Sequence, residues 1–138
     1  MTGPSLKQLH AHKQIHDTGL ALAVQMTDDL IMNYKDYDEA TLKQEVLAIV
    51  DFFESRIISH ADAEEEVQGF YSEVVAENPE KAESVIQLKR DHDIMRQIIT
   101  QVKHQIEQGF STNIFDYFRS IIIVNEIHSR DEERLLLQ

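Results

Sequence analysis

The sequence contains no cysteine, and it has only two prolines and four glycines in 138 residues. Without cysteine the chain can form no disulfide, no thiolate metal site and no cysteine nucleophile. Because few residues interrupt regular structure, we expect its secondary-structure elements to be long.

Long hydrophobic runs are also missing. No apolar segment of 18 residues is present to span a bilayer. The short apolar run Leu20–Met26 lacks the basic leader and the small-residue cleavage site of a signal peptide. Together with the absence of cysteine, these features indicate a cytoplasmic protein without a membrane partner.

Basic residues are scarce relative to acidic ones. Lys and Arg total 13 against 25 Asp and Glu, which gives a formal net charge of -12. Such an excess of negative charge argues against nucleic acid and anionic membranes as partners. The length suffices for one domain, residues 1–138, with a core that needs no covalent staple. What the chain does contain is high acidity and seven histidines.

Apolar residues recur at steps of three and four over four segments, which is the period of an amphipathic helix. No segment alternates with the period of a strand. The expected helix starts, in chain order, are Ser5, Asp38, Asn78 and Ser111 or Thr112. Gly69 and Gly109 are expected to end the second and third helices, with residues 70–77 adding an irregular turn. Four such helices with short connections predict an all-α, up-down-up-down antiparallel four-helix bundle.

The apolar stripes of these helices carry unexpected polar residues. Core positions of a bundle are normally Leu, Ile, Val or Phe. Here each stripe carries one histidine, and two stripes carry a glutamate one turn later on the same face. These six residues are His16, His60, Glu64, His92, His128 and Glu132. A buried, unpaired carboxylate is costly, so it must be protonated, paired or bound to a metal ion.

The depth of the four histidines in the bundle is an independent indication. Counted from the expected helix ends, all four lie roughly 13–21 Å from the same end of the bundle. Glu64 and Glu132 lie one turn closer to that end. Imidazole and carboxylate ligands suit iron, zinc, manganese or copper. Because two carboxylates can offset two adjacent cations, the set suits two metal ions better than one.

Other residues near these motifs have simpler interpretations. The stripe of the first helix is expected to include Leu9, Lys13 and Thr27, and that of the second to end at Val67. For Asn125, a hydrogen bond to a bound ligand and an ordinary buried contact are equally good alternatives. His12 is either a support for the site or, more simply, solvated. The residues expected to face water are His10, Glu65, Glu66, His104, Asp131 and Glu133.

The order of the motifs resembles that of the hemerythrin-like HHE cation-binding domains. These have His on the first helix, His-x-x-x-Glu on the second, His on the third and His-x-x-x-Glu on the fourth, and the match extends from His16 to Glu132. The resemblance implies that the six residues bind two iron ions joined by an oxo or hydroxo bridge, with Glu64 and Glu132 shared. Zinc and manganese remain alternatives, because the ligand types alone permit them.

One position departs from the oxygen-carrying hemerythrins, which have a second histidine on the third helix. Arg96 stands at that place here. In addition, Glu132 follows its histidine one residue earlier than the last carboxylate of the carriers. The set is more similar to the hemerythrin domains of the iron-responsive F-box protein and of the proteins that repair nitrosatively damaged iron centres.

These observations leave three functional hypotheses. The first is a non-catalytic di-iron protein that binds or senses a small diatomic ligand, dioxygen or nitric oxide, or iron itself. The second is a di-iron redox enzyme acting as a peroxidase, in nitric oxide reduction or in iron-centre repair. The third is a metal-free interaction bundle with buried polar pairs. The sequence does not decide between binding and turnover, and it leaves the oligomeric state open.

Overall fold

The computed structural model describes residues 9–137, and within this range the chain is all-helical, with no strand. The all-α prediction is confirmed. A π-helical turn, Phe53–Ile58, joins α2 to α3, and two short 3-10 turns, Tyr34–Asp36 and Pro79–Lys81, lie in connections. The helices are α1 (Leu9–Asn33), α2 (Glu39–Phe52), α3 (Ser59–Glu65), α4 (Phe70–Glu77), α5 (Ala82–Gln108) and α6 (Asn113–Leu136).

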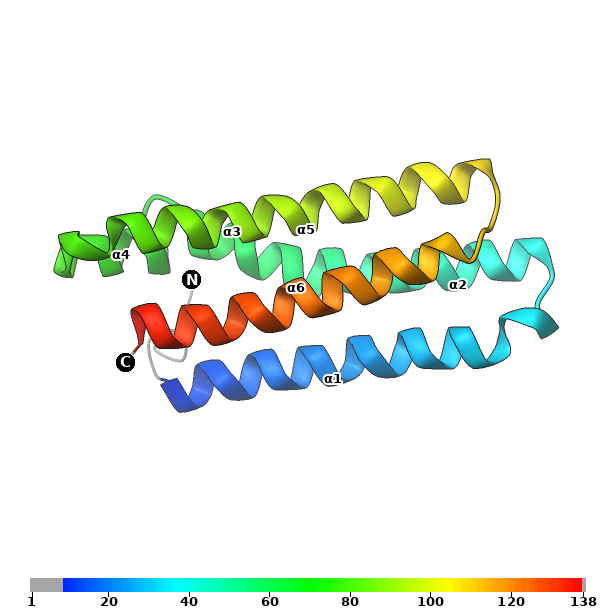
Figure 1. Ribbon diagram of the computed structural model, residues 1–138, viewed down its shortest axis with the longest axis horizontal. Coiled ribbons are helices and arrows are strands. Elements are labelled where there is room, and N and C mark those ends of the chain that lie inside the picture. The colour runs from blue at the N-terminus through cyan, green and yellow to red at the C-terminus, as the bar shows by residue number, and fades with distance from the viewer. Residues whose placement is uncertain (1–8, 138) are drawn as a thin grey trace.

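Four long helical segments lie alongside one another: α1, the combined α2–α3 segment, α5 and α6 (Figure 1). α6 packs against both α1 and α5. The start of α1, the end of α3, the start of α5 and the end of α6 lie at the same end of the molecule, which α4 extends. None of the described helices is long and apolar enough to cross a membrane.

Two apolar clusters hold the helices together. The larger one fills the half of the molecule away from α4 and includes Val46, Phe53, Val102 and Phe118, all fully buried. The smaller one joins α4, α5 and the end of α6. Since each such side chain contributes about 1.5–3 kcal/mol when buried, the packing has a source of stability apart from any ligand.

Local chemistry explains some of the helix ends. Asp38 caps α2 as expected, because its carboxylate accepts the backbone N–H of Thr41 at 2.8 Å. Gly109 ends α5 with φ 119°, a conformation that glycine adopts without strain. The expected cap of the first helix, Ser5, lies outside the described residues. Asn78 precedes the turn Pro79–Lys81 as expected, but neither its side chain nor that of Thr112 makes a capping hydrogen bond. At the start of α6 the hydroxyl of Ser111 accepts the backbone N–H of Asn113 at 3.3 Å.

The end of the second helix differs from the sequence prediction. Instead of an irregular extension, residues 70–77 form a separate helix, α4, and Val67 is 89% exposed in the turn before it. Gly69 allows this turn, because a Cβ at this position would lie 2.4 Å from the carbonyl oxygen of Ala63. The apolar stripe therefore ends at α3, and α4 folds back to cover that end of the bundle.

The register of α1 also corrects the predicted stripe. Ala23, Thr27 and Leu30 are buried, and extending their spacing backward brings His16 and then His12 to the interior. Lys13 is exposed. The prediction was wrong here because it was anchored on apolar residues near the start of the helix, whereas the packed half of the helix sets which face is inside.

The π-helical turn changes the spacing of the second segment. Buried residues there follow one another at steps of four, as Phe53, Ile57 and Ala61, before Glu64. A π turn holds more residues per turn than an α-helix and often occurs at functional sites. As a result Glu64 points into the interior, while His60 lies at the edge with its side chain 21% exposed.

The turn at Gly69 yields a stability prediction. We expect Gly69→Ala to lower the free energy of unfolding by about 1–3 kcal/mol, because the added Cβ would meet a backbone oxygen that cannot move freely. Gly19→Ala is the matched control, since a Cβ there meets nothing within 4 Å and alanine favours the helix. Urea denaturation of both variants measures the difference. Equal stability of the two would contradict this account of the turn.

Candidate metal centre

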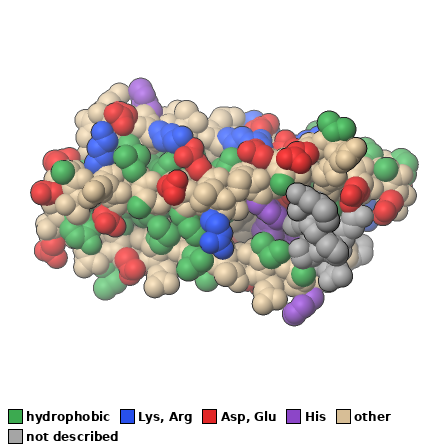
Figure 2. Space-filling view, turned by 180° about the vertical axis from the view of Figure 1, so that it is seen from behind, with side chains coloured by type: hydrophobic (Ala, Val, Ile, Leu, Met, Phe, Trp, Pro, Cys, Tyr) green, Lys and Arg blue, Asp and Glu red, His purple; other side chains and the backbone are tan. Residues whose placement is uncertain are grey.

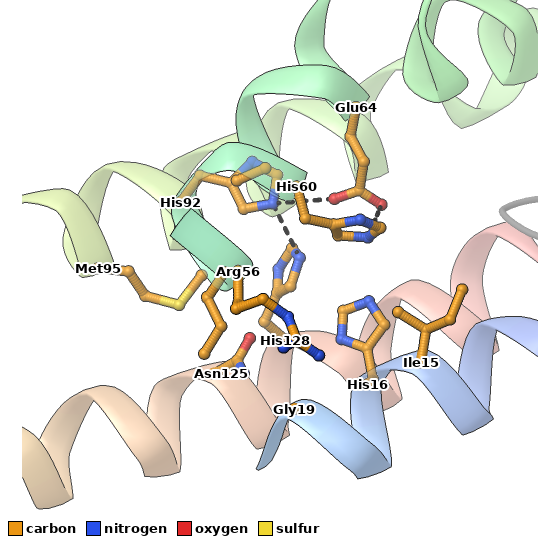
Figure 3. A pocket seen from close by; sticks show the side chains of 12 residues that line it. Ile15, His16, Gly19, Arg56, His60, Glu64, His92, Met95, Asn125 and His128 are labelled. Carbon is orange, nitrogen blue, oxygen red and sulfur yellow. Dashed lines mark hydrogen bonds and ion pairs between the residues drawn. The ribbon is translucent and has the colours of Figure 1, made fainter. Parts of the chain in front are cut away.

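The four helical segments bring histidines and glutamates together near the end covered by α4. α1 supplies His12 and His16, and α3 supplies His60 and Glu64. α5 supplies His92, and α6 supplies His128 and Glu132. Figure 3 shows the side chains of His16, His60, Glu64, His92 and His128 directed toward one another from α1, α3, α5 and α6. All six residues named from the sequence therefore lie together, and a seventh, His12, joins them.

Two overlapping groups of these residues could hold metal ions. One consists of His12, His16, Glu64 and Glu132, and the other of Glu64, His92, His128 and Glu132. Within each group the ligand atoms, one per residue, lie within 4.8 Å of one another, and every member is buried. Because both groups contain the same two carboxylates, the arrangement offers two adjacent metal positions with shared oxygen ligands.

The imidazoles are divided unevenly between these positions. The rings of His12 and His16 stack with centroids 4.3 Å apart, and the His60 ring lies 5.2 Å from that of His16. His60 belongs to neither group, but its Nε2 lies 3.5 Å from Glu64 Oε2. On the other side His92 and His128 form a pair with Nε2 atoms 3.0 Å apart. Three imidazoles thus border one position and two border the other.

Several buried polar atoms at this point have no hydrogen-bond partner among the described residues. They are Nε2 of His16, Nε2 of His60 and both carboxylate oxygens of Glu64. Buried polar atoms are normally paired, so each exception needs an explanation. All four atoms can supply a lone pair and face the same small space. The residues present therefore fit a metal ion, which would satisfy them together.

The opposite ring nitrogens are held by a surrounding set of polar groups. Such partners orient metal-binding histidines and fix which nitrogen faces the metal. The Nδ1 atoms of four histidines each have one: His12 with Glu133 at 3.1 Å, His16 with Ser129, His92 with Glu65 at 2.5 Å, and His128 with Asp91 at 2.9 Å. In each case Nε2 is left to face the centre.

The contact of His16 with Ser129 determines the protonation of its ring. The single hydroxyl proton of Ser129 is donated to the backbone carbonyl of Asn125 at 2.8 Å. His16 must then donate from Nδ1 to Ser129 Oγ, which leaves the lone pair on Nε2. Burial, together with the charge of His12, lowers the pKa of His16 to about 3. At neutral pH this imidazole is therefore in the form that binds a metal ion.

Burial has the same effect on two further histidines. It lowers the pKa of His92 to about 4, with the neighbouring His128 adding to the effect, and it lowers the pKa of His60. His128 behaves differently. Burial would lower its pKa, but hydrogen bonds with Asp91 and Glu132 raise it to about 9. A metal ion at this position would have to displace the proton of His128.

The two carboxylates differ although both are buried. Burial and the charge of Glu132 raise the pKa of Glu64 well above its usual value. Burial acts in the same direction on Glu132, but hydrogen bonds with His12 and His128 outweigh it, and the pKa of Glu132 falls well below its usual value. Without a metal ion, one carboxylate is thus paired with imidazoles and the other favours its neutral form.

Glu133, which was expected to face water, is buried instead, and so is His12, for which support of the site was the alternative to solvation. His12 is 0% exposed and contacts both Glu132 and Glu133, and Glu133 itself is 2% exposed. The packing of α1 against α6 covers both, which the pattern of either helix alone does not reveal. Glu65 is also partly buried, and its carboxylate contacts Nδ1 of His92. His10, Glu66 and His104 are exposed as expected, and Asp131 is partly exposed.

Tyr71 is a site residue that sequence reasoning missed. It comes from α4, is 1% exposed, and its hydroxyl donates to Glu132 Oε2. The hydroxyl oxygen of Tyr71 also lies 3.4 Å from His92 Nε2. Burial and the nearby carboxylates raise the pKa of this phenol, so it stays protonated. The sequence carried no spacing signal for Tyr71, because its position depends on how α4 folds back over the site.

Arg96 lies outside the site. Its guanidinium donates to Asp62 at 2.7 Å, to Asp93 at 2.8 Å and to Glu65 at 3.0 Å. Arg96 therefore supplies no ligand to the candidate metal centre. It holds Glu65, and through Glu65 it helps to orient His92.

A cavity of about 60 Å³ adjoins the candidate ligands. On this measure one water needs about 10–15 Å³, so the space suits ions and molecules of a few atoms. Its walls include the apolar residues Ile57, Ala61 and Met95. Figure 2 shows histidine side chains that reach the surface of the molecule, with a Lys or Arg side chain close to one of them. A bulky organic substrate would not fit.

Comparison with known proteins gives no further guide to this site. No family model, no curated protein and no solved structure matches the chain. The assignment of the site therefore depends on the geometry and chemistry of its own residues.

The burial of His12 can be tested by substitution. We expect His12→Gln to weaken metal binding about 10–100-fold, since the imidazole either binds a metal ion or supports Glu132. His10→Gln is the matched control, because His10 is exposed two residues away on the same helix. Titration of the metal-free proteins with Co²⁺ measures the affinities. An affinity of His12→Gln equal to that of His10→Gln would exclude His12 from the site.

Metal uptake should also release protons. At pH 7 the metal-free chain carries a proton on His128, whose pKa is about 9, and burial favours a second proton on Glu64. Both must leave when a metal ion binds, so affinity should rise with pH between about 6.5 and 9. Calorimetric titration with Co²⁺ in two buffers of different ionisation enthalpy counts the protons. Release of none at pH 7 would contradict the assignment of His128.

Proposed function

We propose that this chain is a hemerythrin-like, up-down-up-down four-helix protein that holds two iron ions and binds or senses a small diatomic ligand, dioxygen or nitric oxide. One observation carries the proposal: two groups of buried ligands share Glu64 and Glu132, and both oxygens of Glu64 have no hydrogen-bond partner. Two cations next to each other would offset the charge that these carboxylates bring into the interior.

The candidate ligands would be distributed over the two metal positions. His12 and His16 would hold one ion, with His60 beside them, and His92 and His128 would hold the other. Glu64 and Glu132 would be shared between the two. Iron supplies open coordination positions and a change of oxidation state, and both are needed to bind dioxygen or nitric oxide.

The rest of the chain would keep the site rigid and dry. Glu65, Asp91, Ser129 and Glu133 hold the ring nitrogens that face away from the centre. Tyr71 holds one oxygen of Glu132 from the side of α4. The apolar clusters on both sides of the ligand layer exclude water, and the size of the cavity restricts the ligand to a few atoms.

The preference for iron rests on the order of the motifs. Nitrogen and oxygen ligands without sulfur suit iron, zinc and manganese alike. Only the resemblance to hemerythrin-like domains favours iron among these, and metal analysis must decide.

A redox enzyme is the second candidate, acting as a peroxidase, in nitric oxide reduction or in iron-centre repair. One observation favours it: two candidate ligands are connected to solvent through carboxylates. His92 contacts Glu65 and His128 contacts Asp91, and these carboxylates are 23% and 29% exposed. Such pairs could pass protons between the site and water during turnover.

Metal analysis of untagged protein tests the proposal. We expect about two irons per chain, with near-ultraviolet charge-transfer bands that change when dioxygen or nitric oxide is added. Glu64→Ala should lose the metal but keep its helical circular dichroism, because the apolar clusters do not involve Glu64. A protein that binds a single zinc ion and shows no such bands would refute the proposal.

The same preparation separates the two candidates. Turnover of hydrogen peroxide or nitric oxide well above the rate of free iron, reduced in Glu65→Gln, would favour the enzyme. Binding of one ligand per iron pair without turnover would favour the binding protein.

A further inference from the structure

Two exposed isoleucines lie side by side on the outward face of α6. Ile123 and Ile127 are 58% and 56% exposed, and neither belongs to an apolar cluster of the described residues. They are four residues apart, so their side chains adjoin on the helix surface. α6 packs against α1 and α5, which Figure 1 shows on either side of it. Such a pair alone is common on protein surfaces, so the residues around it decide what it means.

The exposed residues of α6 follow the pattern of a coiled coil. A coiled-coil seam alternates steps of three and four residues, which gives a repeat of about 3.5 residues. Exposed residues keep these alternating steps without a break from Asp116 to Arg134. The buried residues of α6 form a separate row toward the core, so this exposed row can receive a further helix. We call the row the outer seam, and it consists of Asp116, Ser120, Ile123, Ile127, Arg130 and Arg134.

The order of residues in the outer seam is complementary to itself when it is reversed. In an antiparallel pair with its two-fold axis level with Asn125, residues at equal distances before and after Asn125 lie opposite each other. Ile123 of each copy then packs against Ile127 of the other at the centre of the contact. At each end Asp116 of one copy faces Arg134 of the other. These opposite charges favour the antiparallel direction.

The parallel direction does not fit. It would bring Asp116 against Asp116 and Arg134 against Arg134, and like charges that face each other across an interface are unfavourable. In the antiparallel pair Arg130 faces the small side chain of Ser120, and its guanidinium is already paired with Asp17 at 2.9 Å. No charge of the outer seam then lies opposite a like charge of that seam.

The charge of the whole chain also directs two copies to this face. With a net charge of -12 each, two copies repel each other over most approaches. The outward face of α6 carries three exposed arginines, Arg119, Arg130 and Arg134, which offset the acids beside them. Repulsion between copies is therefore lower where two such faces meet.

We propose that two copies of this chain associate through the outer seam of α6, as an antiparallel pair with two-fold symmetry. One helix from each copy makes a small interface, so the association is reversible, with a dissociation constant on the order of 10–100 μM. The inference does not depend on the metal centre, because no residue of the outer seam is a candidate ligand.

Sedimentation equilibrium of the full chain over a range of concentrations measures the association. We expect Ile123→Ser to raise the dissociation constant at least about tenfold, since the symmetric contact loses this side chain twice. Ile86→Ser is the matched control. Ile86 is 67% exposed but lies on α5, so its loss should leave the dissociation constant unchanged.

Two results of this measurement would overturn the proposal. One is a chain that stays monomeric up to about 1 mM, well above the expected dissociation constant. The other is a dimer that Ile123→Ser leaves unchanged, because another surface would then make the contact.

Glu126 tests the position of the axis. It lies beside the outer seam, and the antiparallel pair brings it opposite its own copy, where two like charges oppose association. Glu126→Gln should therefore tighten the pair several-fold in the same measurement. A weaker pair in this variant would contradict an axis level with Asn125.

Charge reversal tests the antiparallel direction. Asp116→Arg alone and Arg134→Asp alone each place like charges at both ends of the pair, so each variant should dimerise more weakly than the unsubstituted chain. When the two variants are mixed, opposite charges face each other again, and we expect a heterodimer. Arg90→Asp, at an exposed position of α5, is the matched control and should dimerise as before. Variants that each dimerise unchanged, and form no heterodimer in preference, would overturn the proposed pairing.

Discussion

The organisation of the interior depends on two carboxylates, Glu64 and Glu132, that are fully buried within a few ångströms of the same imidazoles. Two adjacent buried negative charges cannot persist without compensation. In the described residues Glu132 is compensated by His12, His128 and Tyr71, while the oxygens of Glu64 have no hydrogen-bond partner. This imbalance is the strongest physical reason to place cations between them.

The two apolar clusters stabilise a fold that has these polar groups in its interior. The larger apolar cluster stabilises the half of the bundle away from α4, and the smaller one closes the other end. The ligand layer lies between the two, so its polar groups need not hold the helices together. The same layer is also shielded from water, which strengthens every electrostatic interaction within it. Most residues of the apolar clusters are thus separate from the candidate metal ligands, and Tyr71 connects the two.

A second layer of polar groups determines how the ligands are presented. Carboxylates or a hydroxyl hold the Nδ1 atoms of four histidines, and the Nε2 atoms face inward. Arg96 extends this layer to the surface through Glu65. Arg96 thereby supports His92, while His12 of α1 adds a fifth imidazole to the candidate site. Asn125, which is buried, and Arg56, which is exposed, also line the cavity.

The sequence by itself determined the long helices, their approximate bounds and the convergence of six polar residues, because helical periodicity and chain length are local properties. It could not determine the inward position of His12, since the packed half of α1 sets the register of its whole face. Two further features also depend on contacts between distant segments. One is the π-helical turn, which leaves His60 at the edge of the site. The other is the packing of α4 against the bundle, which brings Tyr71 to Glu132. Burial and protonation were decided by tertiary structure alone, because each is a property of what surrounds a side chain.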